Sequence, residues 1–290
     1  MAGLKEIRIR LQSVKNTKKI TYAMKLVSAA KLRKAQESVA RSREYTNALN
    51  SLLREVVAAS ESEQTHPLLR TKEEPKKIRV LVLGGSRGLC GGYNSNVNKQ
   101  IEAFIRARQN GPVSIDWVLV GKKPAEYFRR LNRPYVKSFE NLTEDANNWD
   151  IESITRAVEH DFLTEAIDEV YMIFTRFKSA ISMQPTCEKL LPLESDLLQN
   201  KPLSLSKVIF EPSPAAVFSA MLPRVLRAKV RQAALDAKAS EQGSRMTAMD
   251  SATKNAGELI HKLELTLNKL RQTSITSQLL DIIGGAEAVQ

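Results

Sequence analysis

The chain has 290 residues and a formal net charge of +12, from 44 Lys and Arg against 32 Asp and Glu. No apolar run approaches the roughly 18 residues that a membrane-spanning helix needs, and the N-terminus lacks the apolar stretch of a secretory signal. The two cysteines, Cys90 and Cys187, lie far apart without metal-ligand spacing, which is typical of a reducing compartment. We therefore expect a soluble intracellular protein with free thiols.

The two ends of the chain predict unusually long helices. Residues 4–66 contain neither Gly nor Pro, and residues 224–283 contain no Pro. Each stretch of roughly sixty residues would form a helix about 90 Å long at a rise of 1.5 Å per residue. No single domain core can bury a helix of that length. We expect the chain to begin and end in long rods that are separated by something compact.

A coiled-coil repeat indicates that the two rods pair with each other. Apolar or small side chains recur along both rods at steps of three and four residues. In the first rod the repeat comprises Ile7, Leu11, Val14, Thr21, Met24, Ser28, Leu32, Ala35, Val39, Ser42, Thr46, Leu49, Leu53 and Val56. In the second it comprises Leu226, Val230, Ala233, Ala237, Ser240, Ser244, Ala248, Ser251, Asn255, Leu259, Leu263, Leu267 and Leu270. Small residues dominate the middle of both repeats, so we expect a slim coiled coil that needs an outer partner.

The excess positive charge lies on the rods. Residues 1–58 carry thirteen Lys and Arg against four Glu, residues 224–290 carry ten against seven acids, and residues 59–223 carry 21 of each sign. A solvated coiled-coil flank is the simpler explanation. An acidic partner explains the pattern better, whether nucleic acid, an anionic membrane or an acidic protein surface.

Between the rods, residues 77–211 predict a small α/β domain. Short apolar runs that end at turn residues predict strands at 78–83, 115–120, 170–174 and 185–191. Helices are expected between these strands, one from Asn94 as its N-cap to about Arg108 and others at 124–131 and 151–167. This alternation favours a mostly parallel sheet. Linkers are expected near residues 65–77 and 194–214.

A glycine-rich loop, residues 84–92, follows the first strand and precedes a helix, where phosphate-binding loops lie. It lacks a Gly-Lys-Ser/Thr ending, and its Gly-x-x-Gly-x-x-Gly spacing differs from the dinucleotide pattern. We therefore expect a tight turn with close helix–strand packing. Cys90 is expected to be a packed small hydrophobe, because His66, His160 and His261 are scattered along the chain. We expect no catalytic residue, no metal site and no cofactor.

Three blocks of sequence occur in the order of one known family. The N-terminal block contains Ile7-Arg8-x-Arg10-Leu11-x-Ser13-Val14-Lys15-Asn16-Thr17 and Val27-Ser28-Ala29-Ala30-Lys31-Leu32. The loop block is Arg87-Gly88-Leu89-Cys90-Gly91-Gly92-Tyr93-Asn94. The C-terminal block contains Ser244-Arg245-Met246, Arg271-Gln272-x-Ser274-Ile275-Thr276 and Ile283-Gly284-Gly285-Ala286. Together they resemble the gamma subunit of rotary F-type ATP synthase over nearly the whole chain.

The resemblance implies an α/β fold class: a long antiparallel coiled coil of the N-terminal helix (1–66) and the C-terminal helix (212–290), plus a central Rossmann-like domain (77–211). The chain would be the non-catalytic central rotor shaft of the proton-translocating complex, transmitting torque between the membrane rotor ring and the catalytic ring. Implied partners are the alpha and beta subunits, the epsilon subunit and the membrane c-ring, with one copy per complex and no nucleic acid. The implied location is peripheral, on the cytoplasmic face of a bacterial inner membrane.

The resemblance also implies which residues contact partners. The alpha/beta ring would be contacted by Ile20, Met24, Lys25, Arg245, Arg271, Gln272, Thr276 and Gln278. An apolar tip would turn as a low-friction bearing in an apolar sleeve, and it comprises Leu279, Leu280, Ile282 and Ile283. A frayed helix end is the simpler alternative for the tip, as an ordinary solvated arginine is for Arg245.

Three departures from the family pattern are visible. Ser86 stands where the loop usually has Asp, so any cap or ion pair from that acid is missing. Gln278 stands where the C-terminal signature usually has Glu. The cysteine-bearing insertion of plant-plastid relatives is absent, so we expect no thiol regulation and a bacterial origin.

Two interpretations from other classes stay open. A basic coiled-coil nucleic-acid-binding protein fits the charge, but residues 224–290 contain no Phe, Trp or Tyr, and the first rod offers only Tyr22 and Tyr45 for base stacking. A nucleotide-dependent enzyme would need phosphate-binding side chains that the glycine-rich loop lacks.

Overall fold

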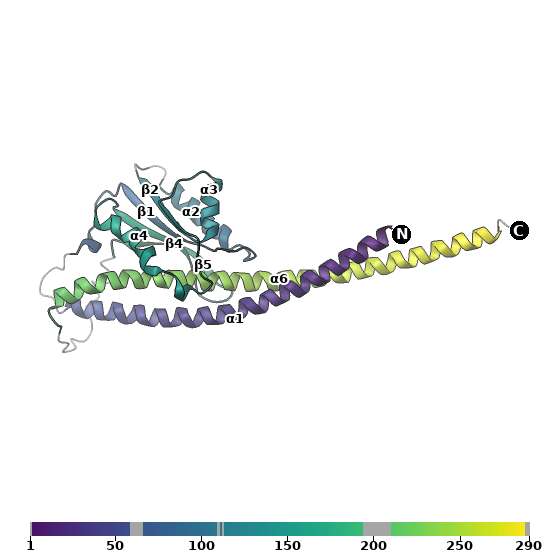
Figure 1. The fold of residues 1–290 in the computed structure, drawn as a ribbon, viewed down its shortest axis with the longest axis horizontal. Coiled ribbons are helices and arrows are strands. Elements are labelled where there is room, and N and C mark those ends of the chain that lie inside the picture. Colours follow the sequence, from purple (N-terminus) through teal and green to yellow (C-terminus); the bar gives the residue numbers. More distant parts are fainter. Residues whose placement is uncertain (1, 59–65, 109–110, 112, 194–209, 288–290) are drawn as a thin grey trace. The chain divides into compact units, whose positions relative to one another are not determined.

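The computed structural model describes residues 2–58, 66–108, 111, 113–193 and 210–287, and for residues 2–3, 58, 281 and 283–287 it describes only the backbone. Its residues form two compact units (Figure 1). The first unit comprises Met1–Ala29 and Arg245–Gln290, and the second comprises Ala30–Ser244. The first unit therefore combines the two ends of the chain, whereas the second is one continuous segment.

The two predicted rods are confirmed as helices α1 (Ala2–Ala58) and α6 (Pro214–Glu287). The expected end of the first rod was wrong, because His66 has an extended backbone. Helix α6 begins ten residues before the Pro-free stretch and contains Pro223 in its third turn. A proline leaves the carbonyl four residues earlier without its helical donor. That carbonyl belongs to Ser219, an exposed residue, so water can satisfy it.

The helices run antiparallel within each unit. In the first unit, Lys15 Nζ lies 2.7 Å from Glu264 Oε1, and Lys25 Nζ lies 2.6 Å from Asp250 Oδ1. The partner number falls as the α1 number rises, which only an antiparallel pair allows. In the second unit, the Arg43 guanidinium lies 3.0 Å from Asp236 Oδ1 and continues this pattern. The expected antiparallel pairing is confirmed.

The coiled-coil repeat of α1 is also confirmed, because every member of it is buried or partly buried, with Leu11, Leu32 and Leu53 buried. In α6 the expected repeat is correct from Leu226 to Ala248 and again at Leu263 and Leu267, which are partly buried, but it is wrong at Ser251, Asn255, Leu259 and Leu270. Ser251 and Asn255 are exposed, whereas the buried positions there are Met249 and Ala256. Small residues occupy several faces of this stretch, so its sequence offers no apolar stripe to fix the contact face.

The second unit contains a five-stranded sheet in the order β3-β2-β1-β4-β5. Its strands are β1 (Lys77–Leu83), β2 (Ser114–Val120), β3 (Lys137–Phe139), β4 (Glu169–Phe177) and β5 (Met183–Leu191). Strand β1 pairs in parallel with β2 and β4, β2 pairs in parallel with β3, and β4 pairs antiparallel with β5. The expected mostly parallel sheet is confirmed, and β3 is an additional edge strand.

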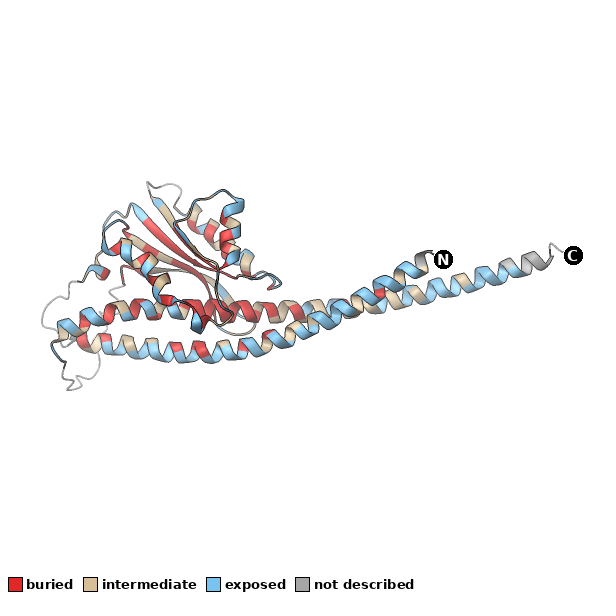
Figure 2. Ribbon diagram, viewed as in Figure 1, coloured by how far each residue is buried: buried red, intermediate tan, exposed pale blue. Residues whose placement is uncertain are grey.

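Three helices complete this domain: α2 (Tyr93–Arg106), α3 (Lys122–Arg130) and α4 (Ile151–Leu163). Helices α2 and α3 bury an aromatic and aliphatic cluster against one face of the sheet, and Figure 2 shows the burial along the strands. That cluster includes Val97, Ile101, Phe104, Trp117 and Phe128. Helix α6 joins the same domain, because Ser240 Oγ donates a hydrogen bond to the Thr175 carbonyl of β4 at 3.0 Å.

Two helix predictions were wrong in detail. Gly92, not Asn94, is the N-cap of α2, and the Asn94 side chain binds the preceding loop. Helix α4 ends at Leu163, four residues before Ile167, which is nevertheless buried. The expected linker at 65–77 carries a short 3-10 helix, η1 (Pro67–Leu69), whose Leu68 is fully buried. Most of the other expected linker, 194–214, lies outside the described residues.

Across the described part of the chain, no helix combines the length and the apolar character required to cross a membrane.

Candidate functional site

The first unit exposes large apolar side chains that its own helices do not cover. On α1 these are Ile9, Ile20, Tyr22, Leu26 and Val27, all more than half exposed. They lie outside the coiled-coil repeat, so the pairing with α6 leaves them in contact with solvent. Ile20 and Val27 are seven residues apart and share one face of α1, whereas Tyr22 and Leu26 are four apart and share another. A large apolar surface that stays exposed marks an interaction surface. Of these five residues, only Ile20 belongs to the contact set that we expected from the sequence.

Met24 and Lys25, which follow Ile20 on the same helix, are partly buried. The Lys25 ammonium donates to Asp250 Oδ1 at 2.6 Å, and Lys254 lies 2.9 Å from the other carboxylate oxygen. These two ammonium groups, Lys25 first, lower the pKa of Asp250 to about 2. Lys25 is therefore already engaged within the chain, and an acidic partner would compete with Asp250 for it.

The polar members of the expected contact set lie along α6. Arg271, Gln272, Thr276 and Gln278 are all exposed, and the Thr276 hydroxyl donates back to the Gln272 carbonyl at 3.0 Å. Gln272 and Thr276 are one helical turn apart and share a face, as their spacing predicts. Arg245 differs from the others, because it is buried with 7% of its surface exposed.

The end of α6 extends beyond the start of α1 within the first unit, as Figure 1 shows. Glu264 pairs with Lys15, and α1 begins at Ala2. At equal rise, the remaining turns of α1 can reach to about residue 277 of α6. Leu279, Leu280 and Ile282 lie past that point and are 55%, 64% and 67% exposed. The side chain of Ile283 lies outside the described residues. The expected tip is thus an unpaired, apolar helix end.

In the second unit, the glycine-rich loop is held by hydrogen bonds and by close packing. Asn94 accepts from the Gly85 N–H at 3.2 Å and donates to the Arg87 carbonyl at 3.2 Å. The Ser244 hydroxyl of α6 donates to the Cys90 carbonyl at 2.6 Å. A Cβ on Gly84 would lie 2.4 Å from Pro124 Cγ, so the loop requires glycine there. The expected tight turn and close packing are confirmed.

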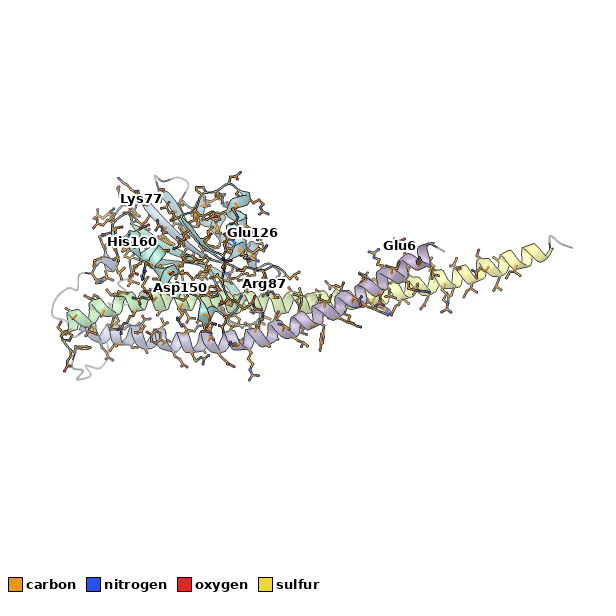
Figure 3. All side chains as sticks on the ribbon, in the orientation of Figure 1. Glu6, Lys77, Arg87, Glu126, Asp150 and His160 are labelled. Atoms are coloured by element: carbon orange, nitrogen blue, oxygen red, sulfur yellow. The ribbon has the colours of Figure 1, made fainter. Side chains whose placement is uncertain are left out.

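The two loop residues with expected roles, Cys90 and Ser86, are both explained by their contacts. Cys90 is buried, as expected for a packed small hydrophobe. Ser86 Oγ accepts from the Lys122 N–H at 3.4 Å, so this serine partly replaces the missing acid as a cap for α3. Arg87, labelled in Figure 3, extends from the loop to Glu144, 3.1 Å away. These contacts give the loop a structural role.

Sequence reasoning missed the charged pairs that join α1 to α6, among them Asp250 and Glu264. Their partners are more than 200 residues away in the chain, so no local spacing reveals them. The exposed apolar residues of α1 could have been predicted from the sequence. Large apolar side chains occur outside the coiled-coil repeat at Ile9, Tyr22 and Val27, where pairing with α6 would not bury them.

Comparison with known proteins gives matches over the full length of the chain. The family model described as ATP synthase matches residues 3–289. An ATP synthase gamma chain from Bdellovibrio bacteriovorus is 39% identical over 299 aligned residues, and one from Desulforamulus reducens is 41% identical over 290; each alignment covers 100% of both chains. A chain of the central stalk and c-ring structure of Tetrahymena thermophila mitochondrial ATP synthase is 25% identical, with a TM-score of 0.58. That match covers 80% of this chain and 99% of the other.

Proposed function

Because this chain belongs to the ATP synthase gamma-chain family, we propose that α1 and α6 are the shaft that carries torque between the membrane rotor ring and the catalytic ring. The chain is a non-catalytic subunit of the central stalk, and the chemistry of the complex belongs to other subunits. The resemblance that the sequence blocks indicate is thereby confirmed. Nothing in these matches supports the nucleic-acid-binding alternative.

The observation that carries the proposal is the exposed apolar surface of the first unit. Isolated helices with this little burial are marginal in water, and a surrounding partner would remove the apolar side chains from solvent. The tip, at Leu279, Leu280 and Ile282, offers few charges, so an apolar sleeve could hold it without directional bonds that resist turning. We propose that this unit enters the bore of a ring of alpha and beta subunits.

The mechanism follows from symmetry. A single shaft with two different helices is asymmetric and cannot contact three equivalent catalytic sites in the same way at once. Each orientation would stabilise a different conformation of the subunit that it faces, and turning would pass that bias around the ring. The positive charge of α1 suits acidic loops on the beta subunits. Ile20, Met24 and Lys25 are the proposed contacts there, with Lys25 exchanging between Asp250 and a beta-subunit carboxylate.

The remaining partners are also proposals. The epsilon subunit and the membrane c-ring would bind the second unit, and the complex would hold one copy of this chain on the cytoplasmic face of a bacterial inner membrane. The support is the family and the presence of a c-ring in the structure of the Tetrahymena relative. Counting the subunits of the purified complex tests this composition.

The proposed grip on the ring can be tested at Gln272 and Thr276, with Arg271 and Gln278 beside them. Replacing Gln272 and Thr276 together by Ala should lower both ATPase activity and proton pumping of the assembled complex. Thr266→Ala is the matched control, because its hydroxyl also bonds back one turn, to the Lys262 carbonyl at 2.9 Å. Full activity of the double variant would show that this patch is not a functional contact. Gln278→Glu should be tolerated, since the family pattern accommodates an acid there.

A further inference from the structure

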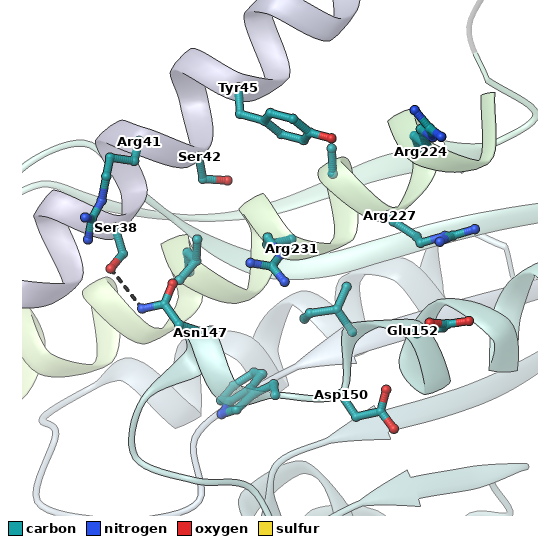
Figure 4. Close-up of a pocket in the computed structure, with 14 residues that line it drawn as sticks. Ser38, Arg41, Ser42, Tyr45, Asn147, Asp150, Glu152, Arg224, Arg227 and Arg231 are labelled. Carbon is teal, nitrogen blue, oxygen red and sulfur yellow. Dashed lines mark hydrogen bonds between the residues drawn. The ribbon is translucent and has the colours of Figure 1, made fainter. Parts of the chain in front are cut away.

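A cavity of about 700 Å³ lies within the second unit, between α1, α6 and the segment that leads into α4 (Figure 4). Four arginines line it: Arg41 from α1, and Arg224, Arg227 and Arg231 from α6. We call this cavity the arginine groove. Its volume falls within the range of about 300–1,000 Å³ that is usual for sites that hold small molecules. It shares no residue with the proposed ring contacts of the first unit.

The four guanidinium groups are available to a ligand. All four arginines are exposed, and none forms an ion pair with any residue in the described part of the chain. The steps of three and four residues from Arg224 to Arg231 place three guanidinium groups on one face of α6, spread over about 10 Å. Arg41 adds a fourth from α1. Like charges gathered at one cavity repel each other unless an anion binds there.

The acidic residues of the groove do not neutralise it. Asp150 accepts a hydrogen bond from the Ser153 N–H at 3.0 Å as the N-cap of α4, and Glu152 is paired with Arg156 at 3.0 Å. Figure 4 shows Arg227 and Arg231 extending from α6 toward the side of the cavity that carries these two acids. Partial burial raises the pKa of nearby Glu159, and the Arg227 guanidinium opposes this effect.

The wall of the groove combines buried polar and apolar groups. Ser42 lines the groove, is about nine-tenths buried, and its Oγ has no hydrogen-bond partner. A buried polar atom without a partner costs about 1–3 kcal/mol, so such an atom calls for an explanation. Its neighbour Ser38 is already bonded, to Asn147 Nδ2 at 3.0 Å. The aromatic side chains of Tyr45 and Trp149 supply an apolar portion of the lining.

We propose that the arginine groove binds a small anion that carries two or more phosphate groups. Guanidinium groups bind phosphate through paired N–H donors, and four of them exceed what a single carboxylate can satisfy. The apolar lining packs against the organic part of the ligand. The phosphates come either from a soluble diphosphate compound or from the headgroup of a diphosphate lipid.

Equilibrium dialysis of the full-length chain against radiolabelled pyrophosphate tests the proposal, since the isolated chain excludes binding by the catalytic ring. We expect one saturable site per chain. Arg227→Gln with Arg231→Gln should weaken binding at least about tenfold, which is one lost charge-assisted contact. Arg33→Gln is the matched control, because Arg33 is a highly exposed arginine of α1 in the same unit that lies outside the groove. Unchanged circular dichroism of both variants verifies that they fold.

The outcomes separate the alternatives. The proposal would be overturned if the wild-type chain showed no saturable binding, or if Arg33→Gln weakened binding as much as the double variant does. It would also be overturned if citrate, at matched ionic strength, displaced the labelled pyrophosphate as effectively as unlabelled pyrophosphate does. A second arm uses phosphatidylcholine vesicles with and without diphosphatidylglycerol. Vesicle binding that pyrophosphate displaces and the double variant lacks would identify a lipid source for the same phosphate site. Vesicle binding that the double variant retains, without pyrophosphate binding, would contradict it.

Discussion

The same two helices are stabilised differently in the two units. In the second unit, every residue of α6 from 233 to 243 is buried, by α1 and by the sheet domain. In the first unit, the buried side chains among those described are Leu11, Ser28, Arg245, Met249 and Ala256. One stretch of helix is thus part of a core, and the other exposes most of its circumference. A helix can therefore be fully formed and still depend on a partner for its stability.

The largest expected effect is in local stability. Amide hydrogen exchange of the isolated chain should be about 1,000-fold slower in β1 and β4 than in residues 5–25, because the strands open only with global unfolding. Limited proteolysis should correspondingly trim the helix segments of the first unit, residues 1–29 and 245–290, and spare residues 77–193 together with the buried α6 segment 233–243. Uniform protection along the chain would show that the first unit is as stable as the second and needs no partner.

A pair of substitutions tests the same contrast at single residues. Phe128→Ala removes a fully buried ring that packs edge-on against Trp117 at 5.2 Å, and it should cost about 3–5 kcal/mol of unfolding free energy. Ile20→Ala removes an exposed side chain and should change the stability of the isolated chain by less than about 0.5 kcal/mol. Chemical denaturation measures both. A comparable loss from Ile20→Ala would show that the first unit has a core of its own.

Two acids of α6 should respond to pH in opposite directions. Lys25 and Lys254 lower the pKa of Asp250 to about 2, so its stabilising effect is present above pH 4 and is lost as the pH falls from about 4 to 2. Burial raises the pKa of Asp236, despite the Arg43 guanidinium 3.0 Å away. The folded state therefore favours the protonated acid, and this contribution to stability is lost as the pH rises through the folded pKa.

Carboxyl NMR titration of the full-length chain checks both directions. The Asp250 resonance should titrate near pH 2, and the Asp236 resonance should titrate above the usual aspartate range. Asp236→Asn should remove the second transition and leave the first unchanged. If the two carboxyls titrated together at the ordinary value, their environments would not differ as the structure indicates.

The smallest expected effect is at the cap of α3. Ser86→Asp places a carboxylate at the helix N-terminus, beside the Lys122 N–H that Ser86 already binds at 3.4 Å. It should stabilise the second unit by about 0.5–1 kcal/mol, whereas Ser86→Ala should cost a similar amount. Thermal unfolding monitored by circular dichroism distinguishes the two. Destabilisation by Asp would mean that the loop does not tolerate the usual residue of the family.

Much of the fold was predictable because its signals are periodic. Residues 4–58 lie within one helix, as the absence of Gly and Pro from residue 4 onward predicts, and the buried strands β1 and β2 agree with their apolar runs to within one residue. Strand β3 was not predictable, because Lys137–Phe139 has three residues and no apolar run. Its pairing depends on the neighbouring strand, which local sequence does not encode.

The site was predictable only in part, for a related reason. The family resemblance predicted that Gln272 and Thr276 contact a partner, and the structure places both on one exposed face of α6. It could not reveal that Lys25 is held by Asp250, 225 residues away, because that pair exists only in the antiparallel register of the helices. The prediction that the coiled-coil repeat includes Ser251 and Asn255 was wrong because small residues surround that part of α6. Only packing decides which of them is buried.

If this chain is the shaft that transmits torque, it must rotate within the complex during ATP hydrolysis. Ile181, between β4 and β5, is 88% exposed, so Ile181→Cys offers a site for a visible probe. The native thiols should not compete, because Cys90 is buried and burial raises the pKa of Cys187 to about 11. With the catalytic ring fixed to a surface, ATP should drive the probe in one direction with three pauses per turn. A probe that keeps a fixed orientation while the complex hydrolyses ATP would show that this chain is not the rotating shaft.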